Sequence, residues 1–216
     1  MNKILFDQIP DMFACVGNIF AEKKEELCEM DARLGDGDLG LTMSKGFAAL
    51  PDIMRAEAEG AAGDIGKLLM KAGMKMSSLV PSTMGFLMSS GIMEGGKALK
   101  GATELDGAGL AAYLAGFAAG IQKRGKCEQG QRTIYDAIMP AAEAAKAAIS
   151  ADPDASLQAV MNAAAEAAKA GMEATRDMVP VFGKAAVHAA QSNGVPDQGA
   201  VAGYYKMVAL SSYINK

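Results

Sequence analysis

The chain has 216 residues, of which 50% are hydrophobic and 6% aromatic, and its formal net charge at pH 7 is −4. This length is enough for one domain with a substantial core, and we expect residues 1–216 to form a single domain. Many Ala, Met and Leu residues with few aromatic ones favour helices over sheets. The acidic charge and the lack of a basic run exclude an extensive nucleic-acid surface, which would need clustered Lys and Arg.

Periodicity predicts a series of helices. From Leu5 to Met30, apolar residues recur every three to four positions, which predicts an amphipathic helix with Pro10 in its first turn. A second helix is expected from about Gly40 to Leu50, where Pro51 ends it. We expect an all-α protein of about eight or nine helices, in which Asp106 and Asp154 act as N-caps. The remaining helical stretches are expected near residues 64–79, 84–99, 107–123, 133–149, 154–170, 183–191 and 198–213.

The cysteines and the N-terminus bear on the cellular compartment. Within one continuous helix, the 13 residues from Cys15 to Cys28 would span about 20 Å, too far for a disulfide. The N-terminus carries two aspartates within its first apolar region, unlike a secretory signal. The longest apolar run, near residues 109–121, is too short to cross a membrane. We therefore expect a soluble cytoplasmic protein without a membrane segment.

The most informative motif is an acidic, glycine-rich turn between the first two helices. It reads Gly35-Asp36-Gly37-Asp38-Leu39-Gly40, and a third carboxylate, Asp31, precedes it. Carboxylates this close repel one another by roughly 1 kcal/mol or more per pair, so they need water or a cation. Mg²⁺ binds through a few carboxylates together with phosphate oxygens. The turn therefore predicts a metal–phosphate site.

Three other interpretations of glycine-rich or acidic stretches are weaker. The G-x-G-x-x-G pattern at 35–40 contains two aspartates that would repel pyrophosphate, and no β-branched strand precedes it. The stretch 91–97 fits G-x-x-x-x-G-K, but Ala98 follows where a P-loop needs Ser or Thr. An EF-hand fails because Thr42 or Phe47 would occupy the position of the bidentate glutamate.

Four further inter-helix segments have chemistry suited to phosphate, and each can also be an ordinary turn or N-cap. They are residues 77–83, 124–133, 176–184 and 195–200. The single histidine, His188, is expected to be a surface or partly buried side chain rather than a catalytic base. One histidine and scattered cysteines offer few residues for a zinc site or for a Ser-His or Cys-His hydrolytic site.

In this order, the acidic turn, the Ser-Ser turn, the Gly-Lys-x-Glu-x-Gly loop and the Pro-Asp-x-Gly-Ala turn resemble the nucleotide-binding L subunit of bacterial dihydroxyacetone kinases. The resemblance covers nearly the whole chain. It implies an antiparallel barrel of eight amphipathic helices that binds ADP or ATP across the loops at one end, with two Mg²⁺ ions. The implied metal ligands are Asp31, Asp36 and Asp38. The implied nucleotide contacts are Leu39, Gly40, Leu41, Thr42, Ser82, Thr83, Gly125, Ile134, Lys184, Asp197, Gln198 and Gly199.

The chain departs from the family pattern in its loops. Leu39 replaces a histidine, Val80-Pro81-Ser82-Thr83 replaces Gly-Gly-Ala-Ser, and Gly130-Gln131-Arg132-Thr133 replaces Gly-Asp-Lys-Thr. Lys184 stands where the family has arginine, and lysine lacks the bidentate fork of a guanidinium. These changes leave the three implied metal ligands in place. They affect what the resemblance implies about the sugar substrate and the partner protein.

The resemblance implies a phosphotransferase subunit that delivers a phosphoryl group to a short keto sugar held by a separate K subunit. A phosphohistidine-bearing M subunit of the phosphoenolpyruvate phosphotransferase chain would recharge the ADP. The alternative is a non-catalytic Mg-ADP-binding paralogue that acts on a regulator or another partner protein. The sequence also leaves open whether the protein forms a homodimer.

Overall fold

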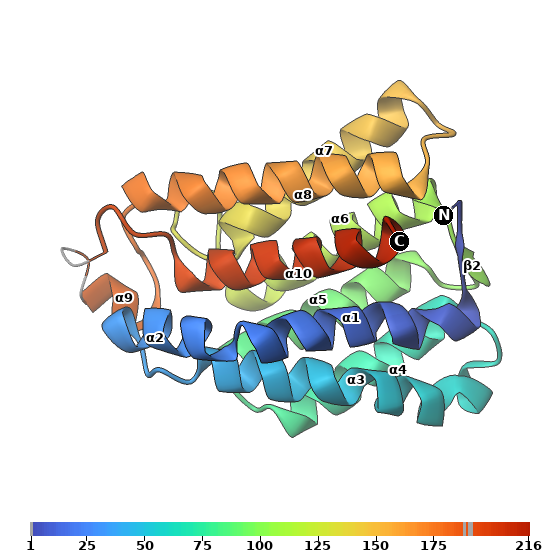
Figure 1. The fold of residues 1–216 in the computed structure, drawn as a ribbon, viewed down its shortest axis with the longest axis horizontal. Coiled ribbons are helices and arrows are strands. Elements are labelled where there is room, and N and C mark those ends of the chain that lie inside the picture. The colour runs from blue at the N-terminus through green and yellow to red at the C-terminus, as the bar shows by residue number, and fades with distance from the viewer. Residues whose placement is uncertain (1, 188, 190–191) are drawn as a thin grey trace.

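The computed structural model describes residues 2–187, 189 and 192–216, and this part of the chain is predominantly helical (Figure 1). Two-residue strands, β1 (Ile4–Leu5) and β2 (Glu104–Leu105), pair antiparallel at the end opposite α2 and α9. The expected all-α class is confirmed. The α-helices are α1 (Ile9–Glu22), α2 (Lys24–Leu34), α3 (Leu39–Ala61), α4 (Ile65–Leu79), α5 (Thr83–Ala98), α6 (Gly107–Gly125), α7 (Tyr135–Ala151), α8 (Leu157–Ala174), α9 (Gly183–Val187) and α10 (Gln198–Ile214), with 3₁₀ turns at Phe6–Gln8 and Thr175–Asp177.

Eight helices pack as a closed ring in chain order: α1, α3, α4, α5, α6, α7, α8 and α10, with α10 against α1. Each helix of the ring runs antiparallel to the one before it, as in an up-and-down bundle. The ring is the antiparallel barrel that the resemblance implied. Helix α2 extends from α1 past the ring and packs on α3 and α10 at one end, close to α9 (Figure 1).

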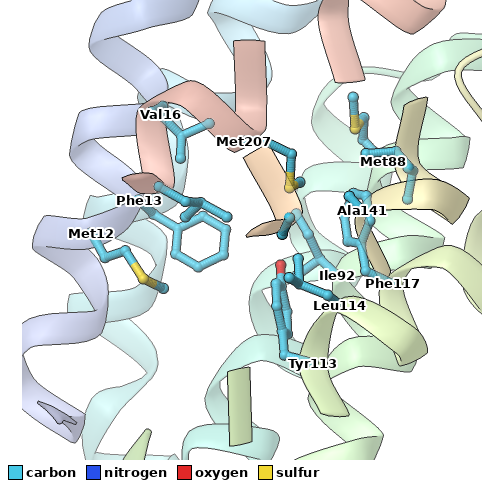
Figure 2. Close-up of a cluster of buried hydrophobic side chains, with 14 of the residues drawn as sticks. Met12, Phe13, Val16, Met88, Ile92, Tyr113, Leu114, Phe117, Ala141 and Met207 are labelled. Carbon is cyan, nitrogen blue, oxygen red and sulfur yellow. The ribbon is translucent and has the colours of Figure 1, made fainter. Parts of the chain in front are cut away.

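The interior of the barrel is filled by apolar side chains that point inward from opposite walls. Figure 2 shows Phe13 from α1, Ile92 from α5, Phe117 from α6 and Met207 from α10 converging on the same space. All four are fully buried. Methionines contribute many of the remaining contacts, because their unbranched side chains fill irregular gaps between helices.

The helix predicted from Leu5 to Met30 is interrupted. Residues 4–8 form β1 and a 3₁₀ turn, and the helix breaks at Lys23, whose φ of −91° and ψ of 9° lie outside the helical region. The break falls in the run Glu22–Glu26, which has no apolar residue to hold one helical face against the barrel. Pro10 lies in the first turn of α1, as predicted.

The predicted end of the second helix at Pro51 is wrong, because α3 continues to Ala61. A proline inside a helix costs about 3 kcal/mol through its missing N–H and its ring. Leu50, Pro51 and Met54 are all buried against the core, and this burial outweighs the cost. The helix ends instead where Ala62 and Gly63 take positive φ angles of 54° and 78°.

Three other predicted boundaries changed. Asp106 caps α6 as expected, accepting from Gly109 N at 2.7 Å, but Ser156 rather than Asp154 caps α8. Helix α7 begins at Tyr135 instead of residue 133. Within the predicted stretch 183–191, α9 covers Gly183–Val187, while His188 lies outside the described residues.

Among the described helices, none combines the length and apolarity that a membrane crossing requires.

Candidate functional site

Because neighbouring helices run in opposite directions, every second helix of the ring begins at the same end. The N-termini of α3, α5, α7 and α10 meet at the end where α2 and α9 lie (Figure 1). A pocket of about 690 Å³ opens there, and residues at all four helix starts line it. Unpaired N–H groups and the positive ends of helix dipoles attract anions. The barrel topology thus produces a site suited to a negatively charged ligand.

The turn between α2 and α3 is built around the carboxylate of Asp31, which is only 8% exposed. Its Oδ2 accepts from the backbone N–H groups of Asp38, at 3.0 Å, and Leu39, at 3.3 Å. Its Oδ1 accepts from Gln198 Nε2 of α10 at 3.3 Å. Asp31 therefore caps the start of α3 from another helix and ties this turn to α10.

Two glycines make the turn possible. Gly37 has a φ of 76°, a conformation that L side chains rarely adopt. A Cβ on Gly40 would overlap the carbonyl oxygen of Lys24, so only glycine lets α3 approach α2 this closely. Both glycines keep Asp36 and Asp38 on the pocket side of the turn, where both side chains line the pocket.

A lysine side chain supplies a positive charge at this acidic turn. The ammonium of Lys184, on α9, pairs with Asp36 Oδ1. The hydrogen bond and charge of Asp36 raise the pKa of Lys184 above its usual value, and the charges of Asp31 and Asp38 add to the effect. Both partners are more than half exposed, so solvent screening leaves the ion pair itself with little effect on stability. The negative charges of all three aspartates nevertheless act on this one ammonium.

The three aspartates offer only oxygen ligands, the donor set that Mg²⁺ prefers. The Lys184 ammonium shows that a cation is tolerated among them. Within residues 2–187, 189 and 192–216, however, no three Asp, Glu, His or Cys side chains are already gathered around one point as metal ligands. Asp31 is engaged with backbone N–H groups and Asp36 with Lys184. The residues therefore fit a magnesium site that requires Lys184 to move away from Asp36.

The start of α5 faces the acidic turn across the pocket. Ser82 caps this helix by accepting from Gly85 N at 3.1 Å, and Thr83 follows it at the pocket wall. Thr42 lies one turn into α3, with its Oγ1 3.3 Å from Ser82 Oγ. This contact joins the α3 and α5 starts and fixes the spacing between these two helix N-termini.

The opposite side of the pocket is held by a buried arginine that sequence reasoning did not single out. Arg132 is 2% exposed and adopts a positive φ of 58°. Its guanidinium donates to the carbonyl oxygens of Thr175, Ser192 and Val195 at 3.2, 3.1 and 2.8 Å. Among the described residues, Arg132 Nη1 finds no hydrogen-bond partner, and the side chain lines the pocket. Arg132 thereby joins two loops and leaves one donor without a hydrogen-bond partner in this part of the chain.

Asp197 lies beside Arg132 and caps α10. Its Oδ2 accepts from Ala200 N at 2.8 Å, and its Oδ1 is 3.8 Å from Arg132 Nη1. Burial raises the pKa of Asp197 to about 6, because the charged carboxylate loses water, while Ala200 N and Arg132 partly offset that effect. Asp197 is thus a structural cap as well as a pocket wall.

The structure brings most of the predicted residues together at one pocket. All three predicted metal ligands line it, as do these predicted nucleotide contacts: Leu39, Ser82, Thr83, Ile134, Lys184, Asp197, Gln198 and Gly199. Gly40 packs against α2, Leu41 is 54% exposed, and Thr42 reaches the pocket through Ser82. Gly125 lies behind Leu87, with 3.0 Å between Leu87 Cδ2 and the position of a Cβ on the glycine. None of these last four is a lining residue.

Several lining residues were missed. Arg132 belongs to the segment 124–133, whose chemistry suits phosphate, but it was not among the predicted contacts. The apolar lining residues Met84, Phe86, Leu87 and Phe182 belong to no motif. Helical periodicity only predicts that such residues are buried. Their side chains give the pocket an apolar wall beside its charged end.

The chain is similar to known proteins over most of its length. Residues 33–212 match the family model of the DAK2 domain. The ADP-binding subunit DhaL of a phosphoenolpyruvate-dependent dihydroxyacetone kinase from Escherichia coli is 28% identical over 204 residues, which cover 94% of this chain and 95% of that protein. A D-erythrulose kinase from Mycolicibacterium smegmatis is 30% identical, but the match covers only 32% of its length.

Solved structures show the same fold. The dihydroxyacetone kinase of C. freundii in complex with AMP-PNP and Mg²⁺ matches 95% of this chain with a TM-score of 0.66 and 25% identity. The native form of the same enzyme gives a TM-score of 0.67 at 24% identity. The chain covers about a third of that enzyme, 33% and 34% in the two structures.

Proposed function

This chain belongs to the DAK2-domain family, and we propose that it is the Mg-nucleotide subunit of a dihydroxyacetone-type kinase. The observation that carries the proposal is the meeting of four helix N-termini and three aspartates at one pocket. The charged end suits a diphosphate with its metal ions, and the apolar wall suits a nucleoside base. Relatives of this chain are dihydroxyacetone and erythrulose kinases, including an ADP-binding subunit of similar length.

The phosphates would lie between the α3 and α5 starts. There, backbone N–H groups near Leu39 and Thr83 and the Ser82 and Thr83 hydroxyls surround the pocket. Asp31, Asp36 and Asp38 would hold two Mg²⁺ ions, which neutralise charge on the transferring phosphoryl oxygens. Lys184 would exchange Asp36 for a phosphate oxygen, because both are anionic acceptors within its reach.

The base and ribose would lie along the apolar wall of the pocket. Leu87, Ile134 and Phe182 supply apolar surface to it, and Asp197, Gln198 and Gly199 at the start of α10 also line the pocket. The fixed carbonyl contacts of Arg132 hold these loops in place before a ligand binds. Such preorganisation reduces the entropy that binding must offset.

The outer rim of the pocket exposes apolar side chains that suit docking of another protein. Val179, Val181, Phe182 and Val187 are 41–80% exposed, and Leu41 at the start of α3 is 54% exposed. A sugar-binding K subunit that covered this rim would bury them and exclude water from the transfer. We propose that the K subunit holds the keto sugar and that a phosphohistidine-bearing M subunit recharges bound ADP.

Reconstitution tests the proposal. The purified chain should carry ADP with two Mg²⁺ ions in native mass spectra, and it should phosphorylate dihydroxyacetone or a tetrulose only when mixed with a K subunit. Supplying ATP in one arm and phosphorylated M subunit in the other distinguishes the two phosphoryl sources. Retained Mg-ADP binding with no sugar turnover in either arm would favour the non-catalytic paralogue that acts on a regulator.

A further inference from the structure

A second pocket, of about 560 Å³, lies across α4, α5 and α6 and shares no lining residue with the pocket at the helix starts. The three helices approach one another closely. A Cβ on Gly116 of α6 would lie 2.7 Å from Glu94 O of α5, and one on Gly73 of α4 would lie 3.0 Å from Ser89 O. Because α5 is held this tightly between its neighbours, long side chains of α4 and α6 can reach over its outer face.

Three methionines give this groove an apolar surface. Met70 and Met74 come from α4 and Met93 from α5, and Met74 is 55% exposed. All three are absent both from the barrel core and from the partly buried side chains that pack against it. Their apolar surface therefore does not serve the interior of the barrel. Methionine is well suited to adaptable binding surfaces, because its side chain is flexible and polarisable.

Cations surround the methionines. Five of them line the groove: Lys67, Lys71, Lys97, Lys123 and Arg124. Glu94, the one acid in the lining, is shared by Lys97 at 2.7 Å and Lys123 at 3.3 Å. Two acids outside the lining also take part, Glu57 at 2.9 Å from Lys71 and Asp64 at 3.9 Å from Lys67. Glu57 is also paired with Lys75 at 2.5 Å, so six cations against three acids leave three positive charges in excess, on a chain whose net charge is −4.

We propose that this groove binds a small amphipathic carboxylate, with its apolar body on Met70, Met74 and Met93 and its acid group among the lysines. The volume lies in the range of small-molecule sites, about 300–1,000 Å³. Lys67 and Met74 are seven positions apart and so lie about 10 Å apart along α4, which suits a medium-length alkyl or aromatic body. A second copy of this chain is a poor occupant, because two such grooves would place like charges against each other.

The proposal is independent of the nucleotide site, and methionine methyl NMR tests it with octanoate as the probe. We expect octanoate to shift the methyl signals of Met70, Met74 and Met93 while leaving Met84, in the nucleotide pocket, unchanged. Octan-1-ol and octylammonium should bind roughly fivefold more weakly or worse, since they lack the charge that meets the lysines. Equal binding of octan-1-ol would overturn the assignment, as would shifts confined to core methionines such as Met88 and Met207.

Variants separate the groove from a general effect of charge. Lys67→Glu combined with Lys97→Glu should weaken octanoate binding about fivefold or more, whereas Lys146→Glu, at an exposed position of α7, should not. Met74→Gln, at an exposed position, tests the apolar surface without loss of a charge. Far-UV circular dichroism spectra should stay unchanged in all three proteins, which shows that they fold whether or not the other pocket binds a nucleotide. Binding of an acidic amphipathic peptide instead of octanoate would assign the groove to a protein partner and refute this proposal.

Discussion

Lys184 pairs with Asp36 across 148 positions of the sequence, and this contact joins α9 to the acidic turn before α3. The lysine occupies one of the three carboxylates that are proposed to bind metal. Its raised pKa keeps it charged at neutral pH, so it competes with a divalent ion for Asp36. Loading of the site therefore involves the replacement of one cation by another.

Removing this competitor separates metal binding from nucleotide binding. Lys184→Met should increase affinity for Mg²⁺ alone, because Asp36 loses its partner. It should weaken Mg-ADP roughly tenfold or more, because a charged hydrogen bond to phosphate is lost. Titration calorimetry with MgCl₂ and with Mg-ADP measures both. Lys146→Met serves as the control, and a variant with equal or better Mg-ADP affinity would show that Lys184 does not reach the phosphates.

The aspartates differ in the structural contacts that they make besides their proposed role as metal ligands. Asp36→Asn should abolish Mg-ADP binding with little change in thermal stability, because its side chain is 56% exposed. Asp31→Asn should also lower the melting temperature, since Asp31 accepts from two backbone N–H groups at the start of α3. Thermal denaturation and calorimetry measure the two effects, with the exposed Asp52→Asn as control. Full nucleotide affinity in Asp36→Asn would refute the metal assignment.

Arg132 is expected to be critical for stability as well as for the pocket. Arg132→Gln removes the contacts to three loop carbonyls and leaves buried Asp197 without its cation, at a cost of about 3–5 kcal/mol. Denaturant unfolding measures the loss. Arg55→Gln, an exposed residue paired with Asp11, should cost less than about 1 kcal/mol. Similar losses for both variants would mean that the Arg132 contacts contribute little.

Lys206 makes stability depend on pH in the alkaline range. It is fully buried, its Nζ has no hydrogen-bond partner within the part of the chain that the structure describes, and it lies 3.9 Å from the centre of the Phe117 ring. Burial lowers its pKa to about 7 in the folded protein, against about 10.4 when unfolded. Between these values the unfolded chain binds more protons, so stability rises with pH from 7 upward, and below pH 7 the full penalty applies.

Replacing this lysine should therefore stabilise the protein. Lys206→Met keeps a similar shape and removes the charge, and it should add on the order of 4 kcal/mol at pH 7. The rise in stability between pH 7 and 9.5 should flatten in the variant. Denaturant unfolding at several pH values checks both effects. An unchanged slope would mean that Lys206 does not titrate in the folded protein between pH 7 and 9.5.

The local pattern of the sequence was sufficient for most helices and for the acidic turn. Apolar spacing located the helices, and three aspartates among glycines indicated cation chemistry through their spacing alone. The pattern gave a wrong prediction where tertiary packing outweighed the local preference of a residue. Pro51 favours a helix end by itself, but the buried side chains around it keep α3 continuous.

Closure of the ring decided the rest. No local feature states that α3, α5, α7 and α10 begin at the same end, since this follows from eight antiparallel helices packing in sequence. Nor could spacing reveal that Arg132 holds the carbonyls of Thr175 and Val195, or that Lys184 lies against Asp36, because these partners are 43, 63 and 148 residues away. The sequence by itself determined which residues are candidates for binding a metal and phosphates. Only the packed barrel decided which of them face one pocket, because that depends on the direction in which each helix enters the ring.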